Sequence, residues 1–250
     1  RPAGLDGLLV GADTVTRLDP CGQSPTLRTG RGLAAQHIAA SESGGERWSK
    51  RATADLVSRI HPELDKLIGA LSDEAAVNAC RVDAVFARIP PAVRPALADA
   101  LYRDALDGTG RSTDLPEFDR RALESAARAW SQALIEATTR LATLPAAAWP
   151  SEPTIWTTAL GEVWIGSRGA NSGTGDPILL VDPGGDDHWR LRPDATAPGS
   201  GLAPVRGWID LGGDDVWRSG VLGAGGAAFG IGFGVDVAGE IIEFVENHAD

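Results

Sequence analysis

A motif of twelve residues that occurs twice constrains this chain more than any other feature. The first copy, residues 179–190, reads Leu-Leu-Val-Asp-Pro-Gly-Gly-Asp-Asp-His-Trp-Arg, and the second, residues 207–218, reads Gly-Trp-Ile-Asp-Leu-Gly-Gly-Asp-Asp-Val-Trp-Arg. Aligning Asp182 with Asp210 makes seven positions identical, at an offset of 210 − 182 = 28 residues. A degenerate third copy has Asp236 at this position, 236 − 210 = 26 residues further on. This period is too short for a propeller blade and is typical of one coil of a solenoid.

The residue types within each copy predict a local structure. A few strand residues precede an aspartate, a Gly-Gly pair and an Asp-Asp pair. Glycine allows the chain to turn sharply while its backbone amides point at the carboxylates. Stacked copies would place equivalent residues about 4.8 Å apart. The sequence therefore predicts three columns of side chains: Asp182 on Asp210 on Asp236, Asp186 on Asp214 on Glu240, and Trp189 on Trp217.

Columns of carboxylates need compensation. Two such charges at this spacing repel each other by about 0.9 kcal/mol in water and by several-fold more near a protein surface. Backbone amides, the arginines at 190 and 218, or a bound cation can supply the compensation. Hard cations such as calcium prefer clustered oxygen ligands. The candidate metal ligands are Asp182, Asp186, Asp187, Asp210, Asp214, Asp215 and Asp236.

The repeat resembles the Gly-Gly-Asp-Asp-aromatic repeats of secreted or envelope proteins of bacteria. It is more distantly similar to the glycine- and aspartate-rich calcium-binding β-roll repeats of bacterial exoproteins. The resemblance covers roughly residues 178–240. It implies a β-solenoid, calcium as the ion that stabilises it, and a location outside the cytoplasm, whether periplasmic, on the cell surface or secreted.

The N-terminal half has a different pattern. Apolar residues recur at helical spacing over residues 31–145. Ser72-Asp73-Glu74 predicts the start of one helix, and Asp114 with Glu117 predicts a capping box for a longer helix over residues 115–144. Helices with one apolar stripe each and short connections are expected to pack as a small bundle.

The helical pattern ends in an Ala- and Pro-rich stretch, residues 145–153. Residues 155–158 and 163–165 are β-branched or aromatic and predict strands, and residues 166–175 are expected to form a flexible loop. The expected fold class is α+β, an N-terminal helical bundle followed by a short parallel β-solenoid. The expected organisation is an extended or loop segment (1–30), a helical domain (31–145), a linker with the first strands (146–177) and the solenoid repeats (178–250).

Composition excludes several partners. The net charge of −11 and the isoelectric point of about 4.8 argue against nucleic acid and anionic membranes. No apolar run approaches the roughly 20 residues of a membrane span. The glycine-rich residues 221–228 resemble a dinucleotide-binding turn, but a strand pattern follows them where that site needs a helix, so no nucleotide cofactor is expected. Cys21 and Cys80 fit a disulfide or two buried thiols equally well.

Two classes of function remain. The leading interpretation is a secreted or envelope-associated binding or structural protein, stabilised by calcium, with a protein or a polysaccharide as partner. The alternative is a β-helical carbohydrate-active lyase or hydrolase that uses the repeat aspartates, although the sequence assigns no catalytic residue. Because the third copy is degenerate, the C-terminal end of the stack is expected to be covered by further chain, by a partner or by the helical domain.

Overall fold

The computed structural model describes residues 8–11, 14–17, 32–47, 49–94, 96–98, 100, 118–191, 204–219 and 229–245. Its helices are α1 (Leu33–Ser43), α2 (Lys50–Val57), α3 (Pro62–Val85) and α5 (Arg120–Leu141), with short 3₁₀ helices at Pro91–Val93 and Ala146–Ala148. Cys21, the expected capping box at 114–117 and the glycine-rich residues 221–228 lie outside the described part. The N-terminal segment contributes a small antiparallel pair, β1 (Leu8–Gly11) with β2 (Thr14–Arg17).

Helix α3 is longer than the sequence predicted. Pro62 occupies its first turn, and the side chain of His61 accepts a hydrogen bond from the backbone N–H of Glu63. The helix runs through Ser72 and Asp73, so the prediction of a helix start there is wrong. Both residues are buried, and Asp73 accepts a hydrogen bond from the Gln36 side chain of α1. A continuous apolar stripe outweighs a local capping signal, because burial of a whole helix face contributes far more than one cap.

Helix α5 begins at Arg120 rather than near residue 115, and Asp119 is its N-cap. The Asp119 carboxylate accepts a hydrogen bond from the N–H of Ala122 over 3.0 Å. The predicted apolar stripe is confirmed, since Trp130, Leu134 and Leu141 are fully buried. What the stripe packs against differs from the expected helical bundle.

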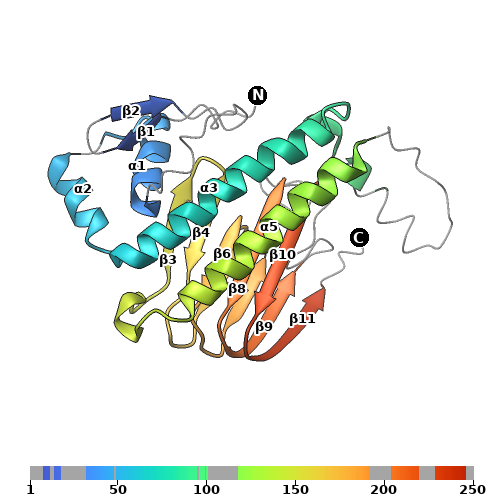
Figure 1. The fold of residues 1–250 in the computed structure, drawn as a ribbon. Coiled ribbons are helices and arrows are strands. Elements are labelled where there is room, and N and C mark those ends of the chain that lie inside the picture. Colours follow the sequence, from blue (N-terminus) through green and yellow to red (C-terminus); the bar gives the residue numbers. More distant parts are fainter. Residues whose placement is uncertain are drawn as a thin grey trace.

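The C-terminal half forms two sheets whose strands alternate along the chain (Figure 1). One sheet has five strands in the order β10-β8-β6-β4-β3, and the other has four in the order β11-β9-β7-β5. All neighbouring strands are parallel except β3 and β4, so the first sheet is mixed. The strands are β3 (Thr154–Thr158), β4 (Gly161–Ile165), β5 (Ser172–Gly175), β6 (Leu179–Asp182), β7 (His188–Leu191), β8 (Val205–Asp210), β9 (Gly213–Ser219), β10 (Ile231–Asp236) and β11 (Gly239–Val245).

The register of these sheets confirms the predicted columns. Asp182 pairs with Asp210 and Asp210 with Asp236, while Trp189 pairs with Trp217. In each copy one strand belongs to the five-stranded sheet and the next to the four-stranded sheet, with the glycine turn between them. The strands predicted at 155–158 and 163–165 are confirmed, but the loop expected at 166–175 contains β5.

The expected bundle followed by a β-solenoid is wrong, because the five-stranded sheet carries helices on one face. In Figure 1, α3 and α5 cross that sheet, and a single hydrophobic core joins their stripes to its strands. Trp130 of α5 packs over Gly207 of β8 and donates its Nε1–H to the carbonyl of Arg206 over 2.7 Å. The chain therefore has an α/β architecture with one mixed and one parallel sheet. The apolar stripes are buried against this sheet as well as against the neighbouring helix.

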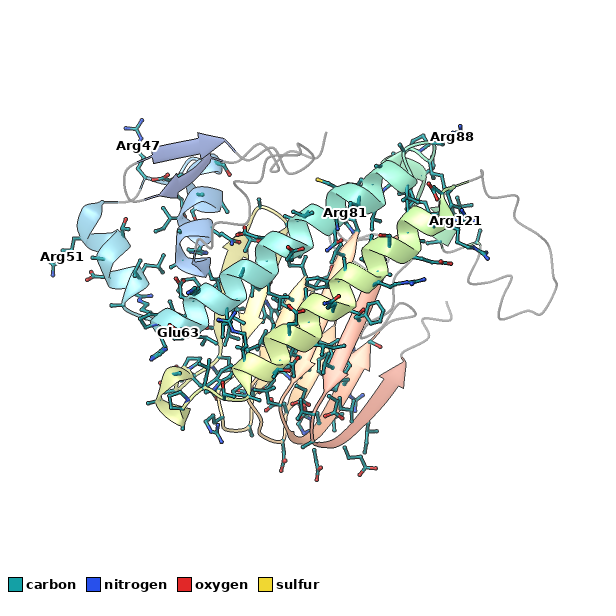
Figure 2. The ribbon with its side chains drawn as sticks, in the orientation of Figure 1. Arg47, Arg51, Glu63, Arg81, Arg88 and Arg121 are labelled. Atoms are coloured by element: carbon teal, nitrogen blue, oxygen red, sulfur yellow. The ribbon has the colours of Figure 1, made fainter. Side chains whose placement is uncertain are left out.

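Arginines mark the exposed side of the helical layer. Figure 2 shows Arg88 and Arg121 at the end where the C-terminus of α3 approaches the N-terminus of α5, with Arg81 further along α3. All three are exposed.

Among the helices that the structure describes, none combines the length and the apolarity that crossing a bilayer requires.

Candidate cation site between the two sheets

The inner faces of the two sheets pack through tryptophans. Trp164 and Leu180 from the five-stranded sheet form one buried cluster with Trp189 and Trp217 from the four-stranded sheet. Side chains alternate between the faces of a strand, so Asp182, two residues after Leu180, also points into this layer. Asp215, two residues before Trp217, does the same. The repeat therefore directs carboxylates into an apolar interior.

The first aspartate of each copy caps the glycine turn. Asp182 accepts a hydrogen bond from the N–H of Gly184 over 3.0 Å, and Asp210 accepts one from Gly212 over 2.9 Å. Gly184 and Gly212 have φ of +116° and +148°, which favours glycine at both positions. The predicted role of glycine in directing amides toward carboxylates is confirmed here.

The Asp-Asp pair divides between two environments. Asp187 and Asp215 are buried and join neighbouring copies, because the N–H of Asp187 donates to Asp215 Oδ1 over 2.8 Å. Asp186 and Asp214 are exposed, and the N–H of Asp214 donates to Asp186 Oδ1 over 3.1 Å. Sequence reasoning treated the two acids of each pair as equivalent. Only the second of each pair reaches the interior.

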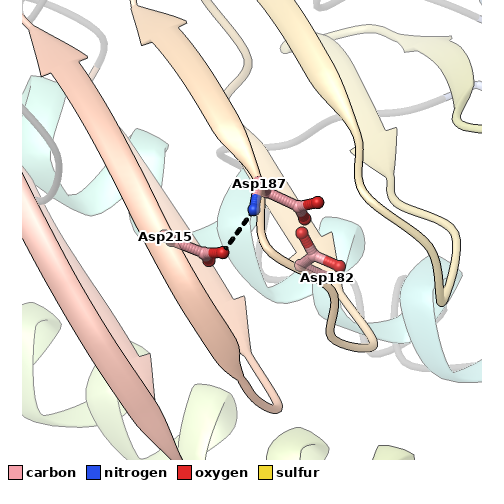
Figure 3. Close-up of side chains that lie close together, drawn as sticks. All are labelled: Asp182, Asp187 and Asp215. Atoms are coloured by element: carbon pink, nitrogen blue, oxygen red, sulfur yellow. Dashed lines mark hydrogen bonds between the residues drawn. The ribbon is translucent and has the colours of Figure 1, made fainter.

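Three of the seven predicted ligands come together. Asp182, Asp187 and Asp215 each offer one carboxylate oxygen, and these oxygens lie within 4.8 Å of one another. Figure 3 shows Asp182 and Asp187 on the two sides of one glycine turn, with Asp215 on the neighbouring strand. The three side chains are 0%, 0% and 1% exposed. Three buried acidic residues that could hold a metal ion therefore lie at one point of the repeat.

Asp210 lies beside this group, and the other predicted ligands lie outside it. Asp210 is 1% exposed, whereas Asp186, Asp214 and Asp236 are exposed to solvent. Burial raises the pKa of Asp210 to about 8, assisted by a hydrogen bond with the Asp215 side chain and by the charges of Asp215 and Asp236. The pKa of Asp210 thus lies well above the ordinary value of an aspartate.

The buried carboxylates are incompletely paired. One oxygen each of Asp182, Asp210 and Asp215, Oδ2 in every case, has no hydrogen-bond donor within the described part. Two ionised carboxylates 4.8 Å apart repel by about 3.5 kcal/mol at an effective dielectric constant of about 20. Unpaired buried acceptors carry a further desolvation cost of about 1–3 kcal/mol each. Among the described residues, these three Oδ2 atoms therefore have no compensating donor.

The arginines of the two complete copies lie outside this layer. Arg190 and Arg218 are exposed, and strand alternation places Arg218 on the same face as Asp214, opposite Asp215. The proposal that these arginines neutralise the acids therefore fits the outward column and not the buried one.

Asn171 is a member of the site that sequence reasoning missed. Ser172 pairs with His188, so Asn171 occupies the position that Asp187 holds in the next copy. Its backbone N–H donates to Asp187 Oδ1 over 2.5 Å, and its side-chain amide donates to both oxygens of Asp187. Burial raises the pKa of Asp187, and these hydrogen bonds oppose the rise.

Residues 163–173 are accordingly a fourth copy of the repeat. Ile165 pairs with Val181, which places Gly166 beside Asp182 in the first column. A Cβ atom at Gly166 would lie 2.7 Å from Asp182 Oδ1, so the absent side chain leaves room for that carboxylate. The offset here is 187 − 171 = 16 residues, and the Asp-x-Gly-Gly-Asp-Asp signature is lost. Gly169 is the residue of this copy that still matches the glycine turn in the sequence, since it aligns with Gly185 and Gly213.

A separate cavity of about 320 Å³ lies near the start of α3. His61, Arg59 and Trp149 contribute to its walls, and none of the repeat aspartates does. It is therefore distinct from the carboxylate cluster.

Comparison of the chain with protein-family models, with curated proteins and with solved structures found no match.

Proposed function

We propose that this chain is a non-enzymatic structural or binding protein whose two sheets are stabilised by a calcium ion held by Asp182, Asp187 and Asp215. The observation that carries the proposal is the presence of buried carboxylate oxygens without donors beside a cluster of three acids. A cation removes both the repulsion and the unpaired acceptors at once.

The ligand chemistry favours a hard cation. Every candidate ligand is a carboxylate oxygen, and the group contains neither cysteine nor histidine, which zinc and copper prefer. Calcium lies about 2.3–2.6 Å from its oxygens, so two ligands of one ion are separated by at most about 5 Å. The separation of 4.8 Å or less between the three oxygens agrees with that limit.

Calcium suits the position better than magnesium. The carboxylates come from two turns and two neighbouring copies of the repeat. Calcium accepts irregular sets of six to eight oxygens, whereas magnesium requires near-octahedral geometry and retains several waters. Asp210 Oδ2 lies next to Asp215 and has no donor within the described part, so it is available to join such a set.

Burial of the three clustered acids argues against their use by a carbohydrate-active enzyme. A glycosidase needs two carboxyl groups on either side of a sugar, in contact with the substrate. Asp182, Asp187 and Asp215 are at most 1% exposed, so no sugar reaches them in this fold. The binding surface for a protein or polysaccharide partner would then lie elsewhere on the molecule, with the ion acting as a structural element.

A location outside the cytoplasm agrees with this role. Calcium sites of extracellular modules bind with dissociation constants of about 10⁻⁴–10⁻³ M, matched to the calcium available there. The resemblance to secreted and envelope repeats of bacteria leads to the same location.

Terbium luminescence and thermal unfolding test the site. Trp189 and Trp217 lie two residues from Asp187 and Asp215 on the same inward face, so a bound terbium ion should emit when tryptophan is excited, and calcium should quench the emission by competition. Calcium at 100 times its dissociation constant should stabilise the fold by about 2.7 kcal/mol, or roughly 5–10 °C in Tm.

Asp182→Asn and Asp186→Asn form a matched pair for this assay. Asparagine at 182 keeps an oxygen for the Gly184 cap but removes an inward charge, so the calcium-dependent shift in Tm should disappear. Asp186 is an exposed neighbour in the same turn, and its substitution should leave the shift intact. Absence of terbium emission and of a calcium-dependent Tm in the wild-type protein would refute the proposal.

A further inference from the structure

We infer that the repeat holds one calcium ion per chain, and that Ile241 at one end, and Gly166 together with Asn171 at the other end, set this number by standing where a further site would need aspartates. The inference rests on the proposed calcium site. It adds which residues limit the number of calcium sites. It also identifies a second, incomplete calcium site that one substitution would complete.

The ligands of the site follow a rule given by the register. Asp182 and Asp187 flank one glycine turn, and Asp215 occupies the position of Asp187 in the next copy. A complete site therefore takes the first and last aspartates of one copy and the last aspartate of the copy that follows. Strand pairing extends this rule in both directions.

The position after the complete site lacks its third carboxylate. Asp210 and Asp215 flank the next glycine turn, and Ile241 pairs with Asp215 where the third ligand would stand. Ile241 packs against the tryptophan cluster, so this position faces the interior as Asp215 does. Asp210 and Asp215 are each 1% exposed, and each has an Oδ2 without a donor. Two of the three ligands are in place there.

The position before the complete site lacks two carboxylates. Gly166 has no side chain, and Asn171 stands in the column of Asp187 and Asp215. The Asn171 amide donates to both oxygens of Asp187, at 3.1 and 3.0 Å. Asn171 thus satisfies the Asp187 carboxylate with hydrogen-bond donors at this end of the column, and it adds no charge.

Calcium stoichiometry of the metal-stripped, full-length chain tests the inference, measured by calorimetric titration and by elemental analysis after dialysis. The wild-type protein should bind one calcium ion. Ile241→Asp should bind two, because it supplies the missing third ligand. Ile242→Asp is the matched control, since Ile242 is 49% exposed and pairs with Val216 on the outward face, and it should still bind one.

Asn171→Asp provides a variant at the other end of the column. It should bind one ion, because Gly166 still contributes no carboxylate. Its metal-free form should also lose stability, since the amide donors to Asp187 are replaced by a charge. Two ions bound to Asn171→Asp would overturn the three-carboxylate rule.

The outcomes separate this inference from the proposed function. No ion bound to the wild-type protein overturns both. One ion bound to the wild-type protein and one to folded Ile241→Asp overturns only the inference. More than one ion bound to the wild-type protein also overturns it, whether or not Ile241→Asp folds.

Discussion

Docking of α5 on the five-stranded sheet can be tested at Gly207. A Cβ atom at this residue would lie 2.7 Å from Trp130 Cζ2 and 3.1 Å from a methyl group of Leu134. Trp130 cannot swing away easily, because its Nε1–H is bonded to the Arg206 carbonyl. Gly207→Ala should therefore destabilise this protein, although alanine is the better residue in a strand whose face is open.

The magnitude follows from two opposing effects. Overpacking of a closed core costs about 1–3 kcal/mol. Replacement of glycine by alanine in a strand by itself stabilises the folded state by about 0.5–1 kcal/mol. The net loss should be about 1–2 kcal/mol. Leu134→Ala alone should cost about 2–5 kcal/mol, since Leu134 is fully buried.

A double-mutant cycle makes the test specific to the helix–sheet contact. Leu134→Ala opens space into which Trp130 can tilt, so the double variant should be about 1 kcal/mol more stable than the sum of the single effects predicts. Urea unfolding followed by circular dichroism gives the free energies of unfolding. Gly169→Ala is the control and should be nearly neutral, because its Cβ would meet nothing closer than 4.0 Å. Strict additivity, or a Gly207→Ala variant as stable as the wild type, would refute the packing described here.

Three further predictions concern the helical layer and a buried ion pair. Gly32→Ala should shift the Tm downward by several degrees, because Asp65, which accepts the N–H of Ala34 at the start of α1, occupies the space of the added methyl. Burial raises the pKa of Asp65, so its folded state holds a proton more tightly than its unfolded state, and stability should rise as pH falls from the raised value toward the ordinary value of 3.8. The stability advantage of Asp65→Asn over wild type at pH 7 should therefore shrink in unfolding experiments at pH 4; an unchanged difference would contradict this. Asp176→Asn should cost about 3–5 kcal/mol in urea unfolding, because it leaves the buried Arg206 without its ion-pair partner, whereas a loss below about 1 kcal/mol would show that the pair is dispensable.

The amino-acid sequence determined the register of the sheets. Seven identities at a fixed offset allow only one alignment of the central copies, and side-chain alternation makes a shift by one residue turn every buried side chain outward. The columns of Asp182 with Asp210 and of Trp189 with Trp217 were therefore predictable from the repeat. The turn was predictable as well, because Gly184 and Gly212 adopt positive φ that favours glycine.

The candidate site was only partly predictable. All three clustered acids were among the predicted ligands, but the sequence could not separate Asp187 from Asp186. Which of two adjacent residues faces inward depends on where the strand begins after the turn. Asn171 was missed because its copy has a shorter spacing and carries an amide in place of the carboxylate.

Tertiary structure alone decided what the helices pack against. The stripe of Trp130, Leu134 and Leu141 shows that one face of α5 is buried, and a second helix or a sheet satisfies that stripe equally well. Gly207 on β8 provides the flat surface on which Trp130 lies, and it is 207 − 130 = 77 residues away in the sequence. An apolar stripe predicts that one face of a helix is buried away from water. It does not specify which element covers that face, because the hydrophobic effect is non-directional.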